Sequence, residues 1–452
     1  MARFLIGVWP YPGHVHPSVS LARVLRRRGH EVAFYTGAMP QDPVEQEGFP
    51  RFGFDRLARS LSASTGMGDG SDTPALYAAL TCRYTTVEDR SPLARLRRTR
   101  ALYREMIAGT LEGQVEDLEQ IRRSWRPDAI VADPFLWAPF VVLHETQDAP
   151  TAVFSFYAGC LVPGTDAPPA GLGLASPRRR GARLRAGMAR LATRMFWRST
   201  QRAVDRVRRG HGLAPLGMPV AAWLGRMPLH LVCSSPEFDY QRRDLPPTVQ
   251  YVGPCGWDGP AMEPRPPGLP SGEGGRPLVY VSEGTAQVRA PVLLRAAVEA
   301  LRQLPADVIV TTGRHRDPSE IGLEHLPANV RVERFVPHGA LFPKLRLVVT
   351  NGGSNTVRGA LQAGVPLVVV PMEWDQLENA QRVAEAGAGL RVPLGRCTPR
   401  SLRAAVERVL GGDTFKRRAE RIAASFARYG NGTRAAELLE ALTEGRAPEG
   451  DA

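Results

Sequence analysis

Short apolar runs alternate with amphipathic segments along the first part of the chain. Residues 3–9, with an apolar run from Phe4 to Trp9, have the pattern of a short buried strand. Residues 10–13 have the composition of a turn, and residues 17–28 carry apolar positions at helical spacing. This succession of strand, turn and helix is typical of a βαβ unit, so we expect a doubly wound parallel sheet in the front half. Further strands of that sheet are predicted at residues 31–36, 128–132 and 151–156.

The second half of the chain repeats the pattern. An amphipathic segment at residues 291–304 lies between apolar runs, as a crossover helix would. The strands predicted there cover residues 278–282, 308–312, 330–335, 347–350 and 367–370. We therefore predict an α/β protein with two doubly wound, Rossmann-like domains that face each other across a cleft.

A segment crowded with proline and glycine divides the two halves. Residues 253–277 have almost no apolar periodicity, and we interpret them as an interdomain linker. This places an N-terminal domain at residues 1–252 and a C-terminal domain at 278–413. The helical pattern at residues 414–443 predicts a tail that packs back toward the N-terminal domain.

Two loops in the front half are longer than compact domains usually carry. Residues 60–74 and 159–177 are rich in Gly, Ser and Pro. We expect them to cover a bound ligand, although the same composition is found in plain surface loops.

A dense run of arginine between residues 178 and 209 predicts a long amphipathic helix. Its apolar positions are Leu184, Met188, Leu191, Met195 and Phe196. We expect them to pack on the domain, because core-facing amphipathic helices are the common kind. The alternative is an interfacial helix that touches anionic lipid or a lipid-like acceptor.

Charge and cysteine content narrow the function classes. The net charge of +13 comes from dispersed arginines, with lysine only at positions 344 and 416, which is a poor pattern for a nucleic-acid partner. The five cysteines form no paired motif typical of zinc sites, and this spacing fits a reducing compartment. The first apolar run is too short for a signal sequence, and no run is long enough to span a membrane, so we expect a cytoplasmic protein.

Two side chains follow predicted strands at the end where parallel sheets bind ligands. His14 follows the first strand and Asp133 follows the strand at 128–132. An imidazole accepts a proton near neutral pH, and a carboxylate on its other nitrogen fixes the tautomer and stabilises the imidazolium. Together they would activate a hydroxyl. Taken singly, His14 could be an incidental loop residue and Asp133 a helix N-cap.

The densest run of chemistry lies between residues 335 and 379. Gly352 and Gly353 let the backbone approach a phosphate, and the amides of residues 354–356 at the start of a helix supply positive dipole. The remaining elements are Phe335-Val336-Pro337-His338 before the glycines, and Asp375-Gln376 followed by Asn379 after them.

This ordered set resembles the donor signature of the GT-B glycosyltransferases that use nucleotide sugars. The family includes plant natural-product glucosyltransferases and actinobacterial antibiotic and macrolide glycosyltransferases, and the resemblance covers nearly the whole chain. It implies an acceptor-binding N-terminal domain, a nucleotide-sugar-binding C-terminal domain and inverting transfer to a hydroxyl of a small, largely apolar acceptor. By motif match, His14 is the base and Asp133 orients it, and neither a metal nor another cofactor is expected.

The resemblance also implies roles in the donor site. Phe335 stacks on the nucleobase, Val336 pairs with it through its backbone, and Asp375 and Gln376 bind sugar hydroxyls. The full donor-binding set is Ser282, Gly284, Thr285, Phe335, Val336, His338, Asn351, Gly352, Gly353, Ser354, Asn355, Thr356, Asp375 and Gln376. The donor is a dTDP-sugar or a UDP-sugar.

Three positions depart from the family pattern. Asn351 stands where many members have histidine, and it carries no positive charge for the diphosphate. His338 and Gly359 stand where plant enzymes have the glutamine and glutamate that bind the ribose. A deoxyribose donor such as a dTDP-sugar depends least on those contacts.

Other functions remain compatible with this fold: transfer to a lipid acceptor at a membrane surface, sugar-nucleotide epimerisation, or a catalytically silent partner protein. Asp375-Gln376 and the run around His14 belong to the transferase pattern rather than the epimerase one. The presence of both His14 and Asp133 argues against a silent protein. Aromatic residues near the cleft suit a flat acceptor or belong to the core; they are Trp9, Tyr11, Phe135, Trp137, Phe154, Phe156 and Tyr157.

Overall fold

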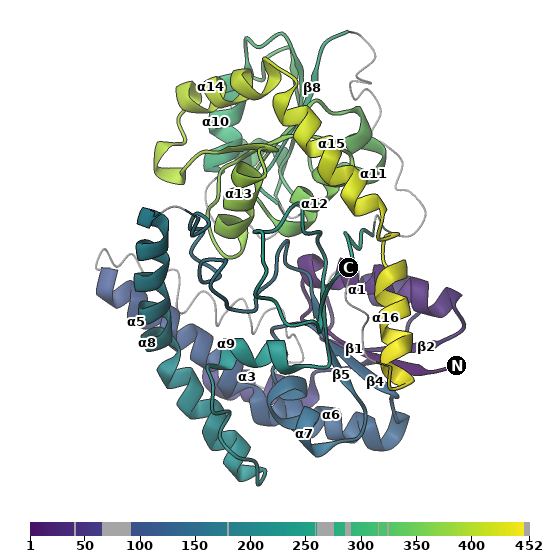
Figure 1. Cartoon of the computed structure of the whole chain (residues 1–452). Helices are drawn as coiled ribbons and strands as arrows, with labels where there is room; N and C mark the ends of the chain where they lie inside the picture. Colours follow the sequence, from purple (N-terminus) through teal and green to yellow (C-terminus); the bar gives the residue numbers. More distant parts are fainter. Residues whose placement is uncertain are drawn as a thin grey trace.

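Two parallel β-sheets form the centres of two lobes, which lie one above the other in Figure 1. This computed structural model describes residues 1–39, 42–65, 92–178, 180–257, 259, 275–284, 291–314, 316–322 and 325–446. The predicted α/β class with two doubly wound domains is confirmed. None of the helices in these ranges has the length and apolar character needed to cross a bilayer.

The lower lobe is built from the first part of the chain. Its strands are β1 (Arg3–Gly7), β2 (Glu31–Tyr35), β3 (Arg51–Phe52), β4 (Ala129–Ala132), β5 (Thr151–Ser155), β6 (Leu229–Val232) and β7 (Val249–Tyr251). Its helices are α1 (Pro12–Arg27), α2 (Pro43–Gln46), α3 (Asp55–Thr65), α5 (Pro92–Arg104), α6 (Leu111–Trp125), α7 (His144–Thr146), α8 (Arg180–Gly210) and α9 (Val220–Trp223), with short π or 3-10 turns at Glu105–Gly109, Pro139–Leu143 and Leu224–Arg226.

The upper lobe follows the same plan. Its strands are β8 (Leu278–Ser282), β9 (Asp307–Thr311), β10 (Val330–Glu333), β11 (Leu347–Thr350), β12 (Leu367–Val369) and β13 (Gly389–Arg391). Its helices are α10 (Val292–Leu301), α11 (His338–Leu341), α12 (Ser354–Gln362), α13 (Gln376–Glu385), α14 (Pro399–Leu410) and α15 (Thr414–Ala427), with 3-10 turns at Pro318–Ile321, Phe342–Lys344 and Leu394–Arg396. The last helix, α16 (Thr433–Thr443), lies on the lower lobe.

The strand order in each sheet places the ligand-binding edge. The lower sheet runs β3-β2-β1-β4-β5-β6-β7 and the upper sheet runs β10-β9-β8-β11-β12-β13, with every pairing parallel. In both, the order reverses next to the first strand of the lobe. Loops leave such a reversal point in opposite directions, which opens a crevice at the carboxyl ends of the strands.

Both faces of each sheet are covered, so the strands are apolar nearly throughout. In β1, Leu5 belongs to the core on the side of α3 and α6, whereas Ile6 belongs to the core on the side of α1 and α16. All four residues of β4 are buried. A one-residue slip would move Leu5 and Ile6 to opposite faces and break the packing that each makes in its own core, so the loops at the strand ends are held in fixed positions.

The end of the chain crosses between the lobes, as the yellow ribbon in Figure 1 shows. Helix α15 packs against α12 of the upper lobe, and α16 then packs against α1 of the lower lobe. Leu439 is fully buried there. Glu440 receives a two-pronged ion pair from Arg28, at 2.8 and 2.7 Å, and contacts His30 at 2.7 Å.

Helix α1 begins earlier than the sequence pattern predicted. We expected a turn at residues 10–13 and a helix from Pro17, but the helix starts at Pro12 and contains Pro17. Proline favours the first helical position, which Pro12 takes here. Pro17, in the second turn, removes the hydrogen bond that its amide would make to the carbonyl of Gly13. His14 therefore lies on a helix rather than on a loop.

Of the two long loops predicted in the front half, one is partly helical and the other is irregular. Residues 60–65 belong to helix α3, which corrects the loop predicted at 60–74, and residues 66–74 lie outside the described residues. The segment at 159–177 is irregular, as predicted.

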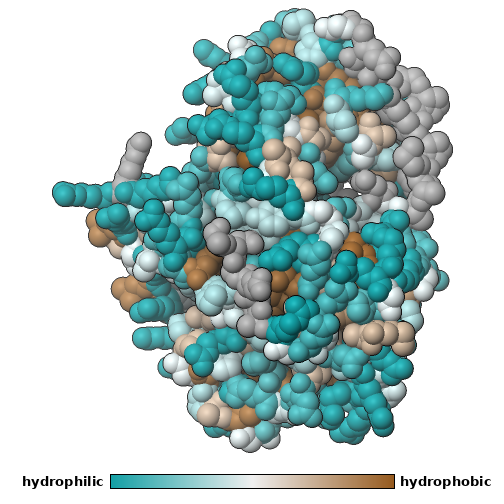
Figure 2. Space-filling view, turned by 45° about the vertical axis from the view of Figure 1, so that its right-hand side comes forward, coloured by the Kyte–Doolittle hydropathy of each residue, from teal (hydrophilic) through white to brown (hydrophobic). Residues whose placement is uncertain are grey.

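Four of the five apolar positions predicted on α8 do not pack on the domain as expected, whereas the half-buried Phe196 packs on Tyr103 with ring centroids 6.0 Å apart. Leu184, Met188, Leu191 and Met195 are 68, 62, 63 and 55% exposed. The buried residues of the helix, Ala186 among them, lie on other positions of the helical wheel. Figure 2 shows a surface that is mainly hydrophilic, interrupted by brown hydrophobic patches, one of them along its left edge.

Candidate active site

A large cavity lies between the two lobes. Its volume is about 3150 Å³, several times the 300–1,000 Å³ of a pocket for one small ligand. Its lining comes from the carboxyl ends of strands in both sheets and includes His14, Phe135, Ser282, Gly353 and Asp375. The cavity is therefore large enough to hold two substrates at once.

His14 and Asp133 meet at the reversal point of the lower sheet. Gly7 of β1 pairs with Ala132 of β4, so the segments that follow these strands begin side by side. His14 Nδ1 lies 2.6 Å from Asp133 Oδ2. The ring nitrogen that remains, Nε2, is the one available to a ligand.

Asp133 is held in place by the backbone around it. Its Oδ1 accepts a 2.6 Å hydrogen bond from the amide of Phe135, and its Oδ2 accepts one of 3.2 Å from the amide of Trp9. The carboxylate is 2% exposed. These bonds fix the oxygen that faces His14, so the orientation of the imidazole is set by the fold.

Aromatic rings form one wall beside His14. The imidazole stacks on Phe156 with 3.7 Å between ring centroids. Phe156 and Tyr157 lie 4.5 Å apart with an interplanar angle of 25°, and Phe135 lies 6.2 Å from Phe156 at 22°. Three nearly parallel rings next to a base make a surface suited to a flat, apolar ligand.

The glycine loop of the upper lobe lies across the cavity. Asn351 follows β11, and its amide group donates to the carbonyl of Glu283 and accepts from the amide of Gly353 at 3.3 Å. Asn351 thus joins the two loops that leave the reversal point of the upper sheet. Gly353 and Ser354 line the cavity, and the amides of the first turn of α12, which begins at Ser354, have no carbonyl partner within the helix.

Gly352 serves the fold more than the cavity. Its φ is +95°, and a Cβ there would lie 2.6 Å from Val369 Cγ1. Only glycine fits this close approach to β12.

Asp375 and Gln376 start helix α13 beside the glycine loop. Asp375 Oδ2 accepts hydrogen bonds from Ser354 Oγ at 2.6 Å and from Asn379 Nδ2 at 2.8 Å. Gln376 Oε1 accepts from the amides of Met372 and Glu373, at 2.9 and 3.0 Å. Both side chains line the cavity and are braced by bonds that leave Asp375 Oδ1 and Gln376 Nε2 for a ligand.

Phe335, Val336 and His338 lie at the far end of the cavity. The Phe335 ring lines it, with the guanidinium of Arg314 3.7 Å from the ring centroid, whereas Val336 is 1% exposed and belongs to the core. His338 Nε2 lies 3.2 Å from the hydroxyl of Tyr280. Burial lowers the pKa of His338 to about 4, so it is neutral at pH 7 and brings no charge to an anionic ligand.

The loop after β8 has two separate faces. Ser282 and Gly284 line the cavity. Glu283 points the other way, where its carboxylate caps α10 by accepting from the amides of Leu293 and Leu294 at 2.7 and 3.3 Å. Burial raises the pKa of Glu283. Thr285, the last residue predicted in this loop, lies outside the described residues.

Helix α12 also connects the lobes. Asn355 donates to the carbonyl of Pro12 at 3.2 Å, and buried Arg358 donates to the carbonyl of Phe156. Arg358 also bonds the side chain of Asn355 at 2.6 Å. Asn355 and Thr356 both line the cavity, and the side chain of Asn355 is occupied by an interlobe contact.

Sequence reasoning missed several cavity residues. Arg314, Tyr280 and Trp374 line it, yet none was assigned a role. Trp374 lies inside the predicted donor run and has φ of +52°, a strained value for a bulky side chain. The positions of Arg314 and Tyr280 in the sequence gave no indication of a role. They reach the other cavity residues only because β8 pairs with β9.

Comparison with solved structures places the fold in a known class. The glycotransferase of kitacinnamycin and the calicheamicin glycosyltransferase each align with a TM-score of 0.70 and 22% identity. The first alignment covers 97% of this chain and 98% of that one, and the second covers 99% and 100%. These are GT-B glycosyltransferase structures, so the predicted GT-B fold is confirmed.

Sequence comparison adds the family. The model described as "Erythromycin biosynthesis protein CIII-like, C-terminal domain" matches residues 295–442. The 4'-demethylrebeccamycin synthase of Lentzea aerocolonigenes is 33% identical over 446 residues, which cover 98% of this chain and 99% of the relative. Demethyllactenocin mycarosyltransferase of Streptomyces fradiae is 26% identical over 461 residues, covering 98% and 87%. The chain belongs to the GT-B glycosyltransferases of antibiotic and other natural-product biosynthesis, and it is a glycosyltransferase.

Proposed function

We propose that this glycosyltransferase inverts the anomeric carbon as it moves a sugar from a nucleoside diphosphate to a hydroxyl of a small, largely apolar acceptor. The observation that carries the proposal is the 2.6 Å contact between His14 Nδ1 and Asp133 Oδ2, placed in the cavity opposite the glycine loop of the upper lobe.

The reaction follows from that placement. His14 Nε2 takes the proton of the acceptor hydroxyl, and the oxygen attacks the anomeric carbon from the face opposite the diphosphate. The new carbon–oxygen bond forms as the bond to the diphosphate breaks, which gives the glycoside and the nucleoside diphosphate. Asp133 stabilises the imidazolium, and the first amides of α12, with the hydroxyl of Thr356, offset the charge gained by the leaving group.

The nucleoside end of the cavity favours a deoxyribose donor. A Cβ on Gly359 would lie 2.9 Å from the Phe342 ring, and His338 stacks on that ring with centroids 4.3 Å apart. Aromatic packing thus fills the positions from which plant enzymes bind ribose hydroxyls. Solved relatives of the same fold, among them the spinosyn rhamnosyltransferase, have been crystallised with thymidine diphosphate. We therefore propose a dTDP-sugar as donor, with a UDP-sugar as the alternative.

Calorimetric and thermal-shift titration with dTDP, UDP, a dTDP-deoxysugar and UDP-glucose tests the donor. We expect dTDP compounds to bind more tightly. Tighter binding of UDP compounds would assign the other nucleotide, and absence of binding by all four would overturn the proposed function.

For the acceptor, we propose a flat aromatic natural product. The parallel rings of Phe135, Phe156 and Tyr157 beside His14 support this. Screening aglycones with product detection by mass spectrometry provides the test. Glycosylation of lipids or polymers alone would contradict it.

A second candidate, transfer to a lipid acceptor at a membrane surface, is favoured by the exposed stripe of α8. Ten of its 31 residues are arginine and one is acidic, and basic amphipathic helices with exposed Leu and Met bind anionic lipid. The helix also lines the cavity through residues such as Trp197.

Flotation with vesicles containing phosphatidylglycerol separates the two candidates. The lipid candidate requires co-flotation at low salt that is lost when Met188 and Leu191 become Asp. Leu326→Asp is the matched control, because Leu326 is an exposed leucine of the upper lobe. Wild-type protein that stays with the bulk solution at low salt would rule the candidate out.

A further inference from the structure

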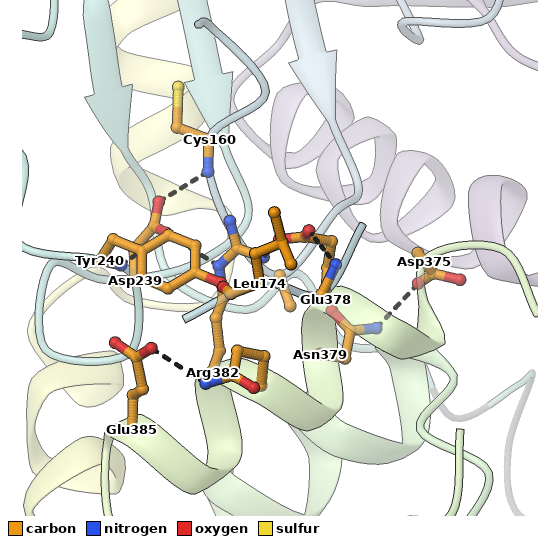
Figure 3. Close-up of polar contacts among 12 residues, drawn as sticks. Cys160, Leu174, Asp239, Tyr240, Asp375, Glu378, Asn379, Arg382 and Glu385 are labelled. Atoms are coloured by element: carbon orange, nitrogen blue, oxygen red, sulfur yellow. Dashed lines mark hydrogen bonds and ion pairs between the residues drawn. The ribbon is translucent and has the colours of Figure 1, made fainter. Parts of the chain in front are cut away.

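An ion-pair network ties the irregular segment at 159–177, here called the acceptor loop, to helix α13. Figure 3 shows Arg382 extending from α13 toward the lower lobe, with Asp239 and Tyr240 beside it. Arg382 Nε contacts Asp239 Oδ1 at 2.8 Å, and its Nη1 contacts Glu378 Oε2 at 2.8 Å. Its guanidinium lies 4.5 Å from the centroid of the Tyr240 ring.

The network is buried, and it contains two carboxylates but only one guanidinium. Arg382 is 5% exposed, and the side chains of Asp239 and Glu378 are 1% and 6% exposed. Burial alone would lower the pKa of Arg382, but the two carboxylates raise it above its ordinary value. One guanidinium faces two carboxylates, so further donors are needed to keep both carboxylates ionised.

The acceptor loop supplies those donors from its backbone. The amide of Cys160 donates to Asp239 at 2.6 Å, and the amide of Gly173 donates to Glu378 at 2.8 Å. Near the end of the loop, the amide of Ser176 donates to Glu385 at 2.6 Å. Lifting the loop would take one hydrogen bond from each of two buried carboxylates, although Asp239 also accepts from the hydroxyl of Tyr251 at 2.9 Å. Loop position and the ion pairs therefore depend on each other.

Two glycines let the loop lie this close. A Cβ on Gly159 would lie 2.2 Å from Arg382 Nε, and a Cβ on Gly173 would lie 2.5 Å from the carbonyl oxygen of Leu377. Gly173 also has φ of +56°. The contact surface is therefore built into the sequence at both ends of the loop.

The same two elements also line the cavity. The acceptor loop lines it with residues such as Leu161 and Pro169, and α13 begins at the cavity with Asp375 and Gln376. Asn379, next to Glu378, bonds Asp375. A short helix is stiff along its axis, so Arg382 and Asp375, two turns apart, move together.

We propose that Arg382 is a positioning residue whose network couples the acceptor loop to the donor-sugar end of α13, so that sugar transfer is favoured over transfer to water. This inference rests on the proposed function for the identity of the two substrates. The dependence of loop position on Arg382 is independent of the proposed function.

The test uses full-length Arg382→Gln and Asp239→Asn, with Gly173→Ala to displace the loop without changing charge. Arg403→Gln is the control, because Arg403 forms an exposed ion pair with Glu407 on α14. Amide hydrogen exchange at residues 160, 173 and 176 reports loop position, and product analysis reports the ratio of transfer to donor hydrolysis. Nucleotide titration and thermal unfolding check that each variant is folded.

We expect Arg382→Gln, Asp239→Asn and Gly173→Ala each to lose amide protection in the acceptor loop. Each should also lower the ratio of transfer to donor hydrolysis about tenfold or more. Acceptor KM should rise while nucleotide affinity stays within about twofold, and Arg382→Lys should recover part of the ratio. Lost protection with an unchanged ratio would overturn the coupling, and unchanged protection would overturn the network itself. Should wild-type protein transfer no sugar, the proposed function fails while hydrogen exchange still decides whether Arg382 positions the loop.

Discussion

The amide of Asp133 donates a 2.9 Å hydrogen bond to the carbonyl of Gly7, which joins the ends of β4 and β1. This backbone bond links residues that are 126 positions apart and sets the start of the Asp133 segment beside the end of β1. His14 follows Gly7 in the chain and lies in the first turn of α1. The proposed base and its orienting carboxylate are thus placed by sheet topology, and the first predictions concern them.

Replacing His14 by Ala should lower kcat by roughly 10²–10⁴-fold, because a positioned general base contributes about that much. Donor binding should change little, since His14 lies in the lower lobe. Steady-state kinetics together with nucleotide calorimetry measure both quantities. Parallel losses of turnover and nucleotide affinity would contradict the assignment.

Asp133→Asn should also lower kcat, because an amide cannot stabilise the imidazolium as a carboxylate does. The two residues act as one unit, so the double variant with His14→Ala should be about as slow as His14→Ala alone. Multiplicative losses in this cycle would show that Asp133 acts independently of His14. Thermal unfolding is needed alongside, because Asp133 also binds the amides of Trp9 and Phe135.

Tyr157→Ala should raise the acceptor KM by about five- to tenfold, since an aromatic contact contributes on the order of 1 kcal/mol. Nucleotide affinity should be unaffected, because Tyr157 belongs to the aromatic wall beside His14. Phe52→Ala, which removes a ring packed on Trp125 outside the cavity lining, serves as the comparison. An equal rise in KM for both variants would point to general loosening of the lobe.

Acid should weaken the fold through His230. This histidine in β6 is fully buried, and burial lowers its pKa from 6.5 to about 4. Between those values the unfolded chain binds more protons than the folded chain, so stability is complete above pH 6.5 and declines as pH falls toward 4. The loss amounts to about 3 kcal/mol.

His230→Gln should therefore reduce the slope of stability against pH, measured by urea unfolding at pH 7.5, 6 and 5, while His338, whose pKa is also lowered to about 4, keeps part of that slope. The variant can be less stable throughout, and the informative quantity is its slope. A slope equal to that of the wild type would show that His230 does not titrate as described.

Leu439→Ala should destabilise the protein by about 2–5 kcal/mol, the usual cost of truncating a buried leucine. Leu439 is fully buried in α16 although it lies near the end of the chain. Thermal or urea unfolding measures the loss, and Leu442→Ala, at a partly buried position of the same helix, should cost less.

Much of the fold could be predicted from local pattern. The strands at 278–282 and 347–350 were predicted to the residue, because buried parallel strands are short apolar runs between polar turns. The short edge strand Arg51–Phe52 was missed, since two residues carry no periodicity. The start of α1 was missed because proline at position 17 was read as a helix start.

The site was predicted less completely. His14 and Asp133 each follow a predicted strand, and their meeting could be expected from the topology that those strands imply. Arg382 and Arg358 could not, because an arginine in an amphipathic helix looks the same whether it faces solvent or a partner domain. The exposure of Leu191 on α8 could not be predicted either. Helical periodicity shows that the apolar residues share one face of the helix, but not whether that face contacts the domain or solvent.

The crossing of the chain end has a practical meaning for enzyme engineering. Hybrid enzymes that combine the acceptor specificity of one family member with the donor specificity of another are naturally cut at the segment joining the lobes. A hybrid of this chain made there would set a foreign α16 against its own α1, and Arg28 would lose Glu440 unless the second parent supplied an equivalent. Two crossover points, the second between α15 and α16, would keep each lobe with the helix that completes it.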